Sequence, residues 1–508
     1  MEETSGNKNQ INSENYQPNI SPINMGRTLD NTVDLNENIK PRDTPAAVQQ
    51  TYDVDLNFDS TQLNSAPANN NPNPNNTKTV KDTMTKHQPT NKDAAPMMVV
   101  SQSQPVTPVI PDDAKFRSVS TPDKYAKFLT TKALVFRCKT GPLEFYYDDR
   151  KLSGKETKNH LIVQVTYVGL NPVDKFIKNG YATPTYGEIG LGREYSGIIT
   201  HVGENLDKDW KLGDEVYGIY YHPHLGVGCL KSSILVDPKL DPIILRPLHI
   251  TEQEAAGSLF CLGAAFNILD KVKNKKKLTP GSNVLIIGGT SSVGMAALQL
   301  LINYYSIETK ITIATRASGA VKLQKLFPSF ASQLIFIDYD SCKGKLADPL
   351  KEIIQNEKYV VLQGDNKVEY PYNQGKFDVV LDFIGGYDVV QNSKTLIRKG
   401  GVYLTTVGDR VANYKKDTFG AYDSASANTR KMFGSMLWSY SYIHYYFDPN
   451  AKTASSNNWI AKCGDLIRNG SVRCIVDKEY NWSETADALS YLSTQRAQGK
   501  LILKVDKF

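Results

Sequence analysis

The sequence predicts an α/β protein in which an all-β module is followed by a doubly wound parallel sheet. Between residues 128 and 255, apolar and polar residues alternate with a period of two and are separated by Gly, Pro and Asn turns, as in β-strands. After Pro280, strand-like and helix-like segments alternate, which implies parallel pairing with right-handed crossovers. Residues 284–302 combine an apolar run, a glycine-rich turn and a helical segment.

Residues 1–115 differ in composition from the rest of the chain. They are rich in Asn, Gln, Pro, Thr and Ser, with tracts such as APANNNPNPNNTK. Such a segment buries too little apolar surface to offset its ordering entropy, so we expect a disordered Asn/Pro-rich tail. Short stretches such as VVSQSQPVTPVI are candidates for docking or phosphorylation; the alternative is a plain solvated tail.

The first folded module is expected over residues 125–270. KALVFRCK, LEFYYDD, HLIVQVTYVGL, REYSGIITHVG, LGDEVYGIYY and SILVDP each have the alternation of a strand. EQEAAGSLFCLGAAFNILDKV then has helical spacing.

The second module is expected over residues 275–420. Its strands are NVLIIG, KITIAT, QLIFID, FDVVLDFIGG and GGVYLTTVG, with one helix running to Tyr305 and another starting near Ser318. The polar stretch 339–376 interrupts the alternation and is predicted to be a surface insertion with a short helix of its own.

The closing segment, residues 421–508, is expected to begin with an aromatic helix and to return to the first module. Four-three-four-three spacing places five residues on one helical face: Phe433, Leu437, Tyr440, His444 and Phe447. This belt suits a membrane interface or a partner, or packing in the core or a dimer. RCIVDKEYNW, ETADALSYLSTQ and GKLILKV then predict strand, helix and strand.

Composition excludes several classes of protein. The chain has 508 residues and a formal net charge of +6, which suits an anionic surface or cofactor but does not indicate nucleic acid. Its six cysteines include no C-x-x-C pair and fit reduced thiols in a cytosolic protein. No apolar run reaches eighteen residues, so any membrane association is expected to be peripheral.

The glycine-rich turn is the main candidate for binding a cofactor. Gly289 and Gly294 occupy the first and last glycine positions of G-x-G-x-x-G, and Ser291 occupies the middle one. With Ser292 and Val293, these residues could hold a dinucleotide pyrophosphate on backbone N–H groups at the positive end of a helix. The hydroxyl of Ser291 either donates a hydrogen bond or crowds the phosphate.

The end of the second strand of the second module, KITIAT, indicates which dinucleotide the site would bind. A site for NAD usually has an acidic residue there, about twenty residues past the turn. This chain has IATRASGAVK instead, and Arg316 and Lys322 favour NADP(H) by charge complementarity to its 2′-phosphate. The alternative for Arg316 is an ordinary solvated surface charge.

The run KVKNKKK, residues 271–277, is a second basic feature. At the expected end of a helix, cations interact favourably with the helix dipole and can attract anionic lipid. A solvated helix end is the alternative.

Five motifs in order resemble the medium-chain dehydrogenase/reductase superfamily, in its zinc-free quinone-oxidoreductase branch. They are YVGLNPVD, LGREYSGIITHVGENLDKDWKLGDEVYG, the glycine turn with FDVVLDFIGG, LIRKGGVYLTTVG and RAQGKLILKV. Within that branch GEIGLGREYSG, GIYYHPHL, RKMFGSM and HYYFDPNAKTAS resemble the fungal Ast family, which is associated with delivering the plasma-membrane proton ATPase to the cell surface. The resemblance implies a GroES-like β-domain, a Rossmann domain and a cleft between them.

The resemblance also bears on zinc and on catalysis. Zinc-dependent relatives carry His where this chain has Arg193, and an arginine cannot ligate zinc, so we expect no zinc. His222, His224 and Cys229 form the only local cluster of ligand types, and a polar surface group explains them as well.

Asn171 resembles a residue that lines the reductase cleft and is the candidate catalytic residue, with Asp174 and Glu194 behind it. The structural alternatives are a turn started by Asn-Pro and an ion pair between Glu194 and Arg193. Many reductases of this branch carry Tyr where Phe266 falls.

Two functions therefore remain. The preferred one, drawn from the resemblance, is a cytoplasmic trafficking factor for the plasma-membrane proton ATPase. It would associate peripherally with anionic membranes, including the plasma membrane and its lipid rafts. The alternative is an NADPH-dependent quinone or enone reductase. The sequence leaves a homo-oligomer open.

Overall fold

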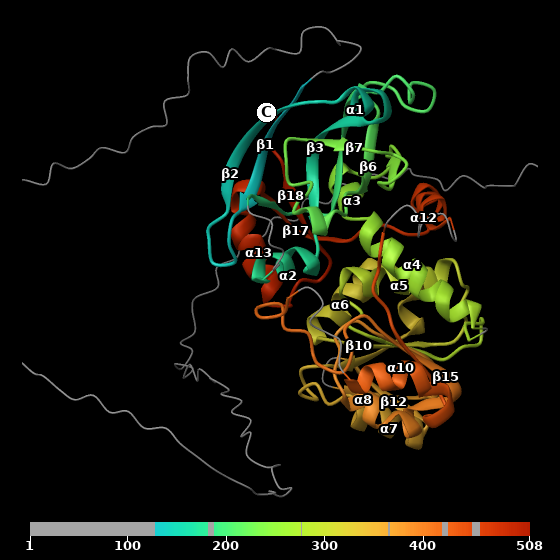
Figure 1. Cartoon of the computed structure of the whole chain (residues 1–508). Coiled ribbons are helices and arrows are strands. Elements are labelled where there is room, and N and C mark those ends of the chain that lie inside the picture. The colour runs from blue at the N-terminus through green and yellow to red at the C-terminus, as the bar shows by residue number, and fades with distance from the viewer. Residues whose placement is uncertain (1–127, 181–186, 276, 364–365, 419–424, 450–457) are drawn as a thin grey trace, which may run out of the picture. The chain divides into compact units, whose positions relative to one another are not determined.

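A computed structural model describes residues 128–180, 187–275, 277–363, 366–418, 425–449 and 458–508 (Figure 1). The tail predicted over residues 1–115 lies outside these residues. Within the described part, the α/β class predicted from the sequence is confirmed, with one mainly antiparallel β-module and one parallel sheet.

The β-module is built on a seven-stranded sheet with strand order β17-β18-β3-β5-β6-β8, in which β7 also pairs with β3. β18 runs antiparallel to β3, so the closing segment of the chain joins the sheet of the first module, as Figure 1 shows. The strands are β3 (Leu161–Leu170), β5 (Glu194–Val202), β6 (Glu215–Ile219), β7 (Ser233–Val236), β8 (Ile243–Leu245), β17 (Val476–Asn481) and β18 (Lys500–Lys504).

A smaller sheet of three strands has the order β2-β1-β4. Its strands are β1 (Phe128–Phe136), β2 (Glu144–Lys151) and β4 (Ile189–Gly190). The helices of this module are α1 (Gly154–Asn159), α2 (Pro172–Gly180), α3 (Glu252–Ala256) and α13 (Thr485–Ser493), with 3₁₀ turns η1 (Pro223–Leu225) and η3 (Trp482–Glu484).

The second sheet has six parallel strands in the order β11-β10-β9-β14-β15-β16. The order reverses at β9 and β14, and ligands of doubly wound proteins bind beyond the carboxyl ends of strands at such a point. The strands are β9 (Val284–Ile287), β10 (Ile311–Thr315), β11 (Leu334–Asp338), β14 (Phe377–Asp382), β15 (Ile397–Thr405) and β16 (Ser441–His444).

Helices and one hairpin accompany this sheet. The long α4 (Leu259–Asn274) and α5 (Ser292–Asn303) pack on each other and share one apolar core with α12 (Trp459–Arg468). The others are α6 (Ala317–Leu326), η2 (Pro328–Gln333), α7 (Ala347–Asn356), α8 (Asp388–Gln391), α9 (Ser393–Leu396) and α10 (Ala425–Leu437). The hairpin of β12 (Lys358–Gln363) and β13 (Asn366–Pro371) lies within the stretch expected as an insertion.

The aromatic segment differs from its prediction. A single helix from Phe433 to Phe447 is wrong, because α10 ends at Leu437 and residues 441–444 form the edge strand β16. Ser439, with φ of +58°, takes the left-handed conformation between them. Tyr440 and His444 are buried, so no continuous belt runs along one helix face.

Candidate functional site

The glycine turn leads directly from β9 into α5. Gly288 has φ of +86°, and Ser291 is the residue that caps the helix. The hydroxyl of Ser291 donates to the carbonyl of Gly288 at 2.8 Å and accepts from the N–H of Gly294 at 3.0 Å. The serine therefore caps the helix from within the turn. The N–H groups of Ser292 and Val293, in the first helical turn, have no intrahelical acceptor and can face an anion.

The two glycines of the motif are explained by close packing. A Cβ on Gly289 would lie 2.2 Å from Cγ2 of Ile313, and a Cβ on Gly294 would lie 2.4 Å from the carbonyl oxygen of Gly288. Any side chain would force the strand, turn and helix apart. The glycine pattern is thus required by the fold itself, whether or not a dinucleotide binds.

The two predicted phosphate-binding cations contact the chain's own C-terminal part. Arg316 caps α6, and its Nη1 donates to the carbonyl of Gln495 at 3.1 Å. Its Nε lies 3.4 Å from a carboxylate oxygen of Asp340. Lys322 forms an ion pair of 3.0 Å with Asp477 and donates to the carbonyl of Gln498. We call these contacts of Arg316 and Lys322 with Asp477, Gln495 and Gln498 the α6 latch.

The latch is reinforced by a fourth contact. The side-chain amide of Gln498 donates to the hydroxyl of Ser318 at 2.8 Å. The loop before β18 is thereby held against the first turns of α6, where the 2′-phosphate of NADP(H) was expected. In this arrangement the cations expected for a 2′-phosphate already have partners. A pyrophosphate at the turn of α5 stays a prediction, which rests on the first N–H groups of that helix.

Asn171 lies in a buried polar network. Its side chain donates to Glu194 at 2.9 Å and accepts from Lys500 at 2.6 Å, while its backbone N–H donates to Asp174 at 2.9 Å. Lys500 also forms an ion pair with Glu194. The N–H of Phe260, in α4, donates to Glu194 at 3.0 Å. The network joins β3, β5, β18 and α4, and both functional atoms of the Asn171 amide are used within it.

Burial and charge act in opposite directions on this network. Burial is the largest influence on the pKa of Lys500 and lowers it, but the carboxylate of Glu194 and the neighbouring thiols of Cys261 and Cys474 together outweigh burial and hold that pKa above its usual range. Burial raises the pKa of Asp174, while Arg193 and two backbone N–H groups oppose the rise. Lys500 was missed by the sequence analysis; the available signal was a lysine directly before the apolar run LILKV.

Arg193 is fully buried at the position where zinc-dependent relatives carry His. Its guanidinium donates to the carbonyls of Val227 and Gly190, and its Nε lies 3.7 Å from Asp174. The ion pair expected between Glu194 and Arg193 is replaced by pairs of Glu194 with Lys500 and of Arg193 with Asp174.

The residues suggested as metal ligands, His222 and Cys229, bind different partners within the protein. His222 hydrogen-bonds Asp241 at 2.6 Å, and the buried thiol of Cys229 donates to the carbonyl of Glu194. The side chain of His224 lies outside the described part. Over the described residues, no group of three or more His, Cys, Asp or Glu is placed to hold a metal ion.

Phe266 belongs to the apolar core of α4 and α5 rather than to an open cleft. It is 1% exposed, and its ring centroid lies 5.8 Å from that of Tyr304. A tyrosine at position 266 would therefore place its hydroxyl group in an apolar environment.

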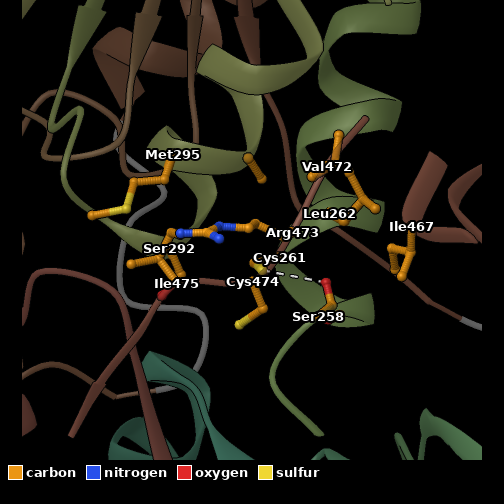
Figure 2. Close-up of a pocket in the computed structure, with 11 residues that line it drawn as sticks. Ser258, Cys261, Leu262, Ser292, Met295, Ile467, Val472, Arg473, Cys474 and Ile475 are labelled. Atoms are coloured by element: carbon orange, nitrogen blue, oxygen red, sulfur yellow. Dashed lines mark hydrogen bonds between the residues drawn. The ribbon is translucent and has the colours of Figure 1, made fainter. Parts of the chain in front are cut away.

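A small pocket lies between α4, the start of α5 and residues 467–475 (Figure 2). Its volume, about 10 Å³, holds no more than a water molecule. Cys261 and Cys474 line it, and burial raises the pKa of both thiols. Figure 2 shows the side chain of Arg473 extending towards Ser292. Arg473 is a cation near the α5 turn that the sequence analysis also missed.

Two family models and several solved structures match this architecture. The alcohol dehydrogenase GroES-like domain matches residues 157–239, and the zinc-binding dehydrogenase model matches residues 358–503. The quinone oxidoreductase from Coxiella burnetii aligns with a TM-score of 0.54 at 19% identity, covering 74% of this chain and 100% of that one. CurK enoyl reductase aligns with a TM-score of 0.54 at 18% identity, covering 75% and 100%. The fold is that of the medium-chain dehydrogenase/reductase superfamily.

Sequence relatives define the family more narrowly. Protein AST1 of Saccharomyces cerevisiae is 56% identical over 81% of this chain and 96% of its own length, and Protein AST2 is 53% identical over 79% and 94%. The chain belongs to the Ast family, which confirms the resemblance. Protein YIM1 from the same species is 26% identical, covering 75% of this chain and 99% of that one. None of the described helices is long and apolar enough to cross a membrane.

Proposed function

We propose that this protein is a peripheral membrane trafficking factor that delivers the plasma-membrane proton ATPase to the cell surface. The ATPase as cargo rests on the resemblance to the Ast family. The supporting observation from the structure is the α6 latch, in which Arg316 and Lys322 bind the chain's own C-terminal part. A reductase whose 2′-phosphate cations are already paired is poorly prepared to bind NADPH, which favours a role that does not require turnover.

The end of α4 is our proposed contact with anionic lipid on the cytoplasmic side of the plasma membrane and its rafts. Lys271 and Lys273 lie in the last turn, and Lys275 caps the helix. All three are exposed. Lys271 and Lys273 lie 5.3 and 5.5 Å from the rings of Tyr445 and Tyr305, so both ammonium groups stand beside aromatic surface. Each lysine close to an anionic membrane surface contributes about 1 kcal/mol to binding.

The alternative is an NADPH-dependent quinone or enone reductase. It is favoured by the turn of α5, whose first N–H groups and neighbouring Arg473 suit a pyrophosphate. In that case the bound nicotinamide would supply the hydride. Gly289, Ser291, Ser292, Val293 and Gly294 would hold its pyrophosphate, Arg316 and Lys322 its 2′-phosphate, and Asn171 would orient the substrate. These roles stay predictions.

One substitution separates the two functions. Ser292→Glu places a carboxylate in the first turn of α5, where the helix dipole favours it and where it repels a pyrophosphate. We expect yeast cells lacking AST1 and AST2 to deliver the ATPase equally well with wild-type protein and with Ser292→Glu. The readout is ATPase abundance in purified plasma membrane, and Ser292→Ala is the uncharged control.

The contrary result is equally specific. If Ser292→Glu is folded but fails to deliver the ATPase, while Ser292→Ala succeeds, trafficking depends on an anion at this turn and the proposal in its present form fails. If purified wild-type protein binds NADPH, reduces a quinone with it and loses both properties in Ser292→Glu, the reductase alternative takes its place.

A further inference from the structure

The strand β2 is a fully exposed edge. All eight of its residues, EFYYDDRK, are solvent-exposed, including the aromatic run Phe145 to Tyr147. It pairs with β1 on one side only, and no other described strand pairs with it. An edge strand with aromatic side chains and unpaired backbone groups is a ready surface for another strand.

The strand is held firmly in place. The ammonium of Lys132, in β1, lies 4.3 Å from the centroid of the Phe145 ring. That ring packs edge-on against the buried Trp482 at 4.8 Å, and the ring of Tyr147 lies 5.6 Å from that of Phe508. β2 is therefore presented as an ordered strand, which lowers the entropic cost of adding a partner strand.

The backbone of β1 determines which groups of β2 face outward. Lys132 and Leu134 bond residues 230–232, on the side of β1 away from β2. Thr131, Ala133 and Val135 must then bond β2, through their partners Asp148, Tyr146 and Glu144. The N–H and C=O groups of the odd-numbered residues, Phe145, Tyr147 and Asp149, consequently point to the free edge.

We propose that the partner of this edge is β2 of a second copy of this chain, paired antiparallel across a two-fold axis. The outward N–H and C=O groups of the two copies can form hydrogen bonds only if odd-numbered residues of one β2 face odd-numbered residues of the other. Every antiparallel self-pairing of that kind is two-fold symmetric, with one residue facing its own copy. The possible registers are therefore few, and charge distinguishes them.

The favoured register places Tyr147 opposite Tyr147 of the second copy. Glu144 then faces Arg150 of the second copy, and Tyr146 faces Asp148, each pair occurring twice. In the neighbouring register centred on Tyr146, Glu144 faces Asp148 of the second copy. In the one centred on Asp148, that residue faces its own copy. Opposite charges across strands stabilise a pairing and like charges destabilise it, so the strand is complementary to itself in one register.

Existing ion pairs extend this pattern. Glu144 already binds Arg137, and Arg150 already binds Glu156, each at 2.8 Å. Pairing of two copies would join them in a row of alternating sign, from Arg137 through Glu144 to Arg150 and Glu156 of the second copy. Because exposed pairs contribute little energy, these charges set the register, while the backbone bonds and aromatic rings supply the affinity.

Site-specific crosslinking tests the register. In full-length protein carrying Cys138→Ser, which removes an exposed thiol, Tyr147→Cys places a thiol against its own copy, whereas Tyr146→Cys does not. Mild oxidation should convert Tyr147→Cys to a covalent dimer and leave Tyr146→Cys monomeric. Equal crosslinking of both variants, or of neither, overturns the proposal.

Charge reversal gives an independent test by analytical ultracentrifugation. The wild type should form a reversible dimer of twice the 56.5 kDa chain mass. Glu144→Arg or Arg150→Glu alone should weaken it roughly tenfold, and the double variant should restore it. A wild type that stays monomeric at high micromolar concentration overturns the proposal. So does a dimer insensitive to these variants, because it would use another face, such as the exposed side of α10.

Discussion

At the scale of single residues, the central feature is the Lys500–Glu194 pair with Asn171 between β3, β5 and β18. Lys500 is 2% exposed and Glu194 is 1% exposed. Two charges at that depth are tolerated because each has a partner, and removing one leaves the other buried without compensation. The network therefore stabilises the joint between the first module and the last strand.

Lys500→Met should lower the free energy of unfolding by about 3–5 kcal/mol. Because the pKa of Lys500 is raised in the folded state, its contribution is complete below the ordinary lysine pKa of about 10.4. It is lost only as pH rises through the folded pKa, so the deficit should be constant from neutral pH to that range. Urea unfolding at several pH values measures it.

The double variant Lys500→Met with Glu194→Gln is the control. It removes both charges and should recover part of the loss. If the double variant is as unstable as the two single variants added together, the pair is not coupled and this account of the network fails.

At the scale of elements, the turn between β9 and α5 shows how packing alone can require a motif. The backbone of Gly288 and the side chain of Ile313 fill the space in which a Cβ at Gly294 or Gly289 would lie. Ser291 then supplies the helix cap from inside the turn. The same glycine motif is therefore expected whether the turn binds phosphate or only packs against its neighbours.

Gly294→Ala should destabilise the ligand-free protein by about 1–3 kcal/mol, because the new methyl group would lie 2.4 Å from a backbone oxygen. Gly281→Ala is the matched control, since a Cβ there meets nothing within 4 Å. It should be neutral or stabilising by up to about 1 kcal/mol. Thermal and urea unfolding without nucleotide provide the comparison. Equal stability of the two variants would show that the turn has room for a side chain.

The helices and strands differ in how well the sequence predicts them. Strand and helix alternation gave the α/β class because each element buries its own periodic face. The segment around Tyr440 was misassigned because helical spacing was counted across Ser439, where the chain reverses its conformation. The buried residues Tyr440, Tyr442 and His444 in fact follow a period of two. Lys322 was predicted from the sequence to bind a 2′-phosphate. Its partner Asp477 lies 155 residues away along the chain, and that contact depends on the whole fold.

At the scale of the whole molecule, the α6 latch joins the parallel-sheet module to the closing segment that completes the β-module. Its ion pair and hydrogen bonds occupy Lys322 and Arg316, the two cations predicted to bind a 2′-phosphate. If these cations do bind that phosphate, NADP(H) has to compete with the latch, and its apparent affinity falls with the fraction of molecules in which the latch is open.

Asp477→Asn should weaken the hold on Lys322 and increase the affinity for NADPH by roughly 3–10-fold, without changing the affinity for NADH. Nicotinamide fluorescence titrations with both nucleotides measure this. Asp465→Asn, which breaks the exposed pair with Arg468, is the control and should change neither. An equal change for NADPH and NADH would mean that the latch does not act on the 2′-phosphate.

The contact between Tyr147 and Phe508 has a practical consequence. Phe508 lies against the same face of β2 as the ring of Tyr147, so a fluorescent protein or affinity tag joined after Phe508 starts beside the edge strand. Such a fusion would hinder the approach of a second copy by its bulk alone. Localisation and self-association are therefore better measured in a protein that carries no fusion directly after Phe508.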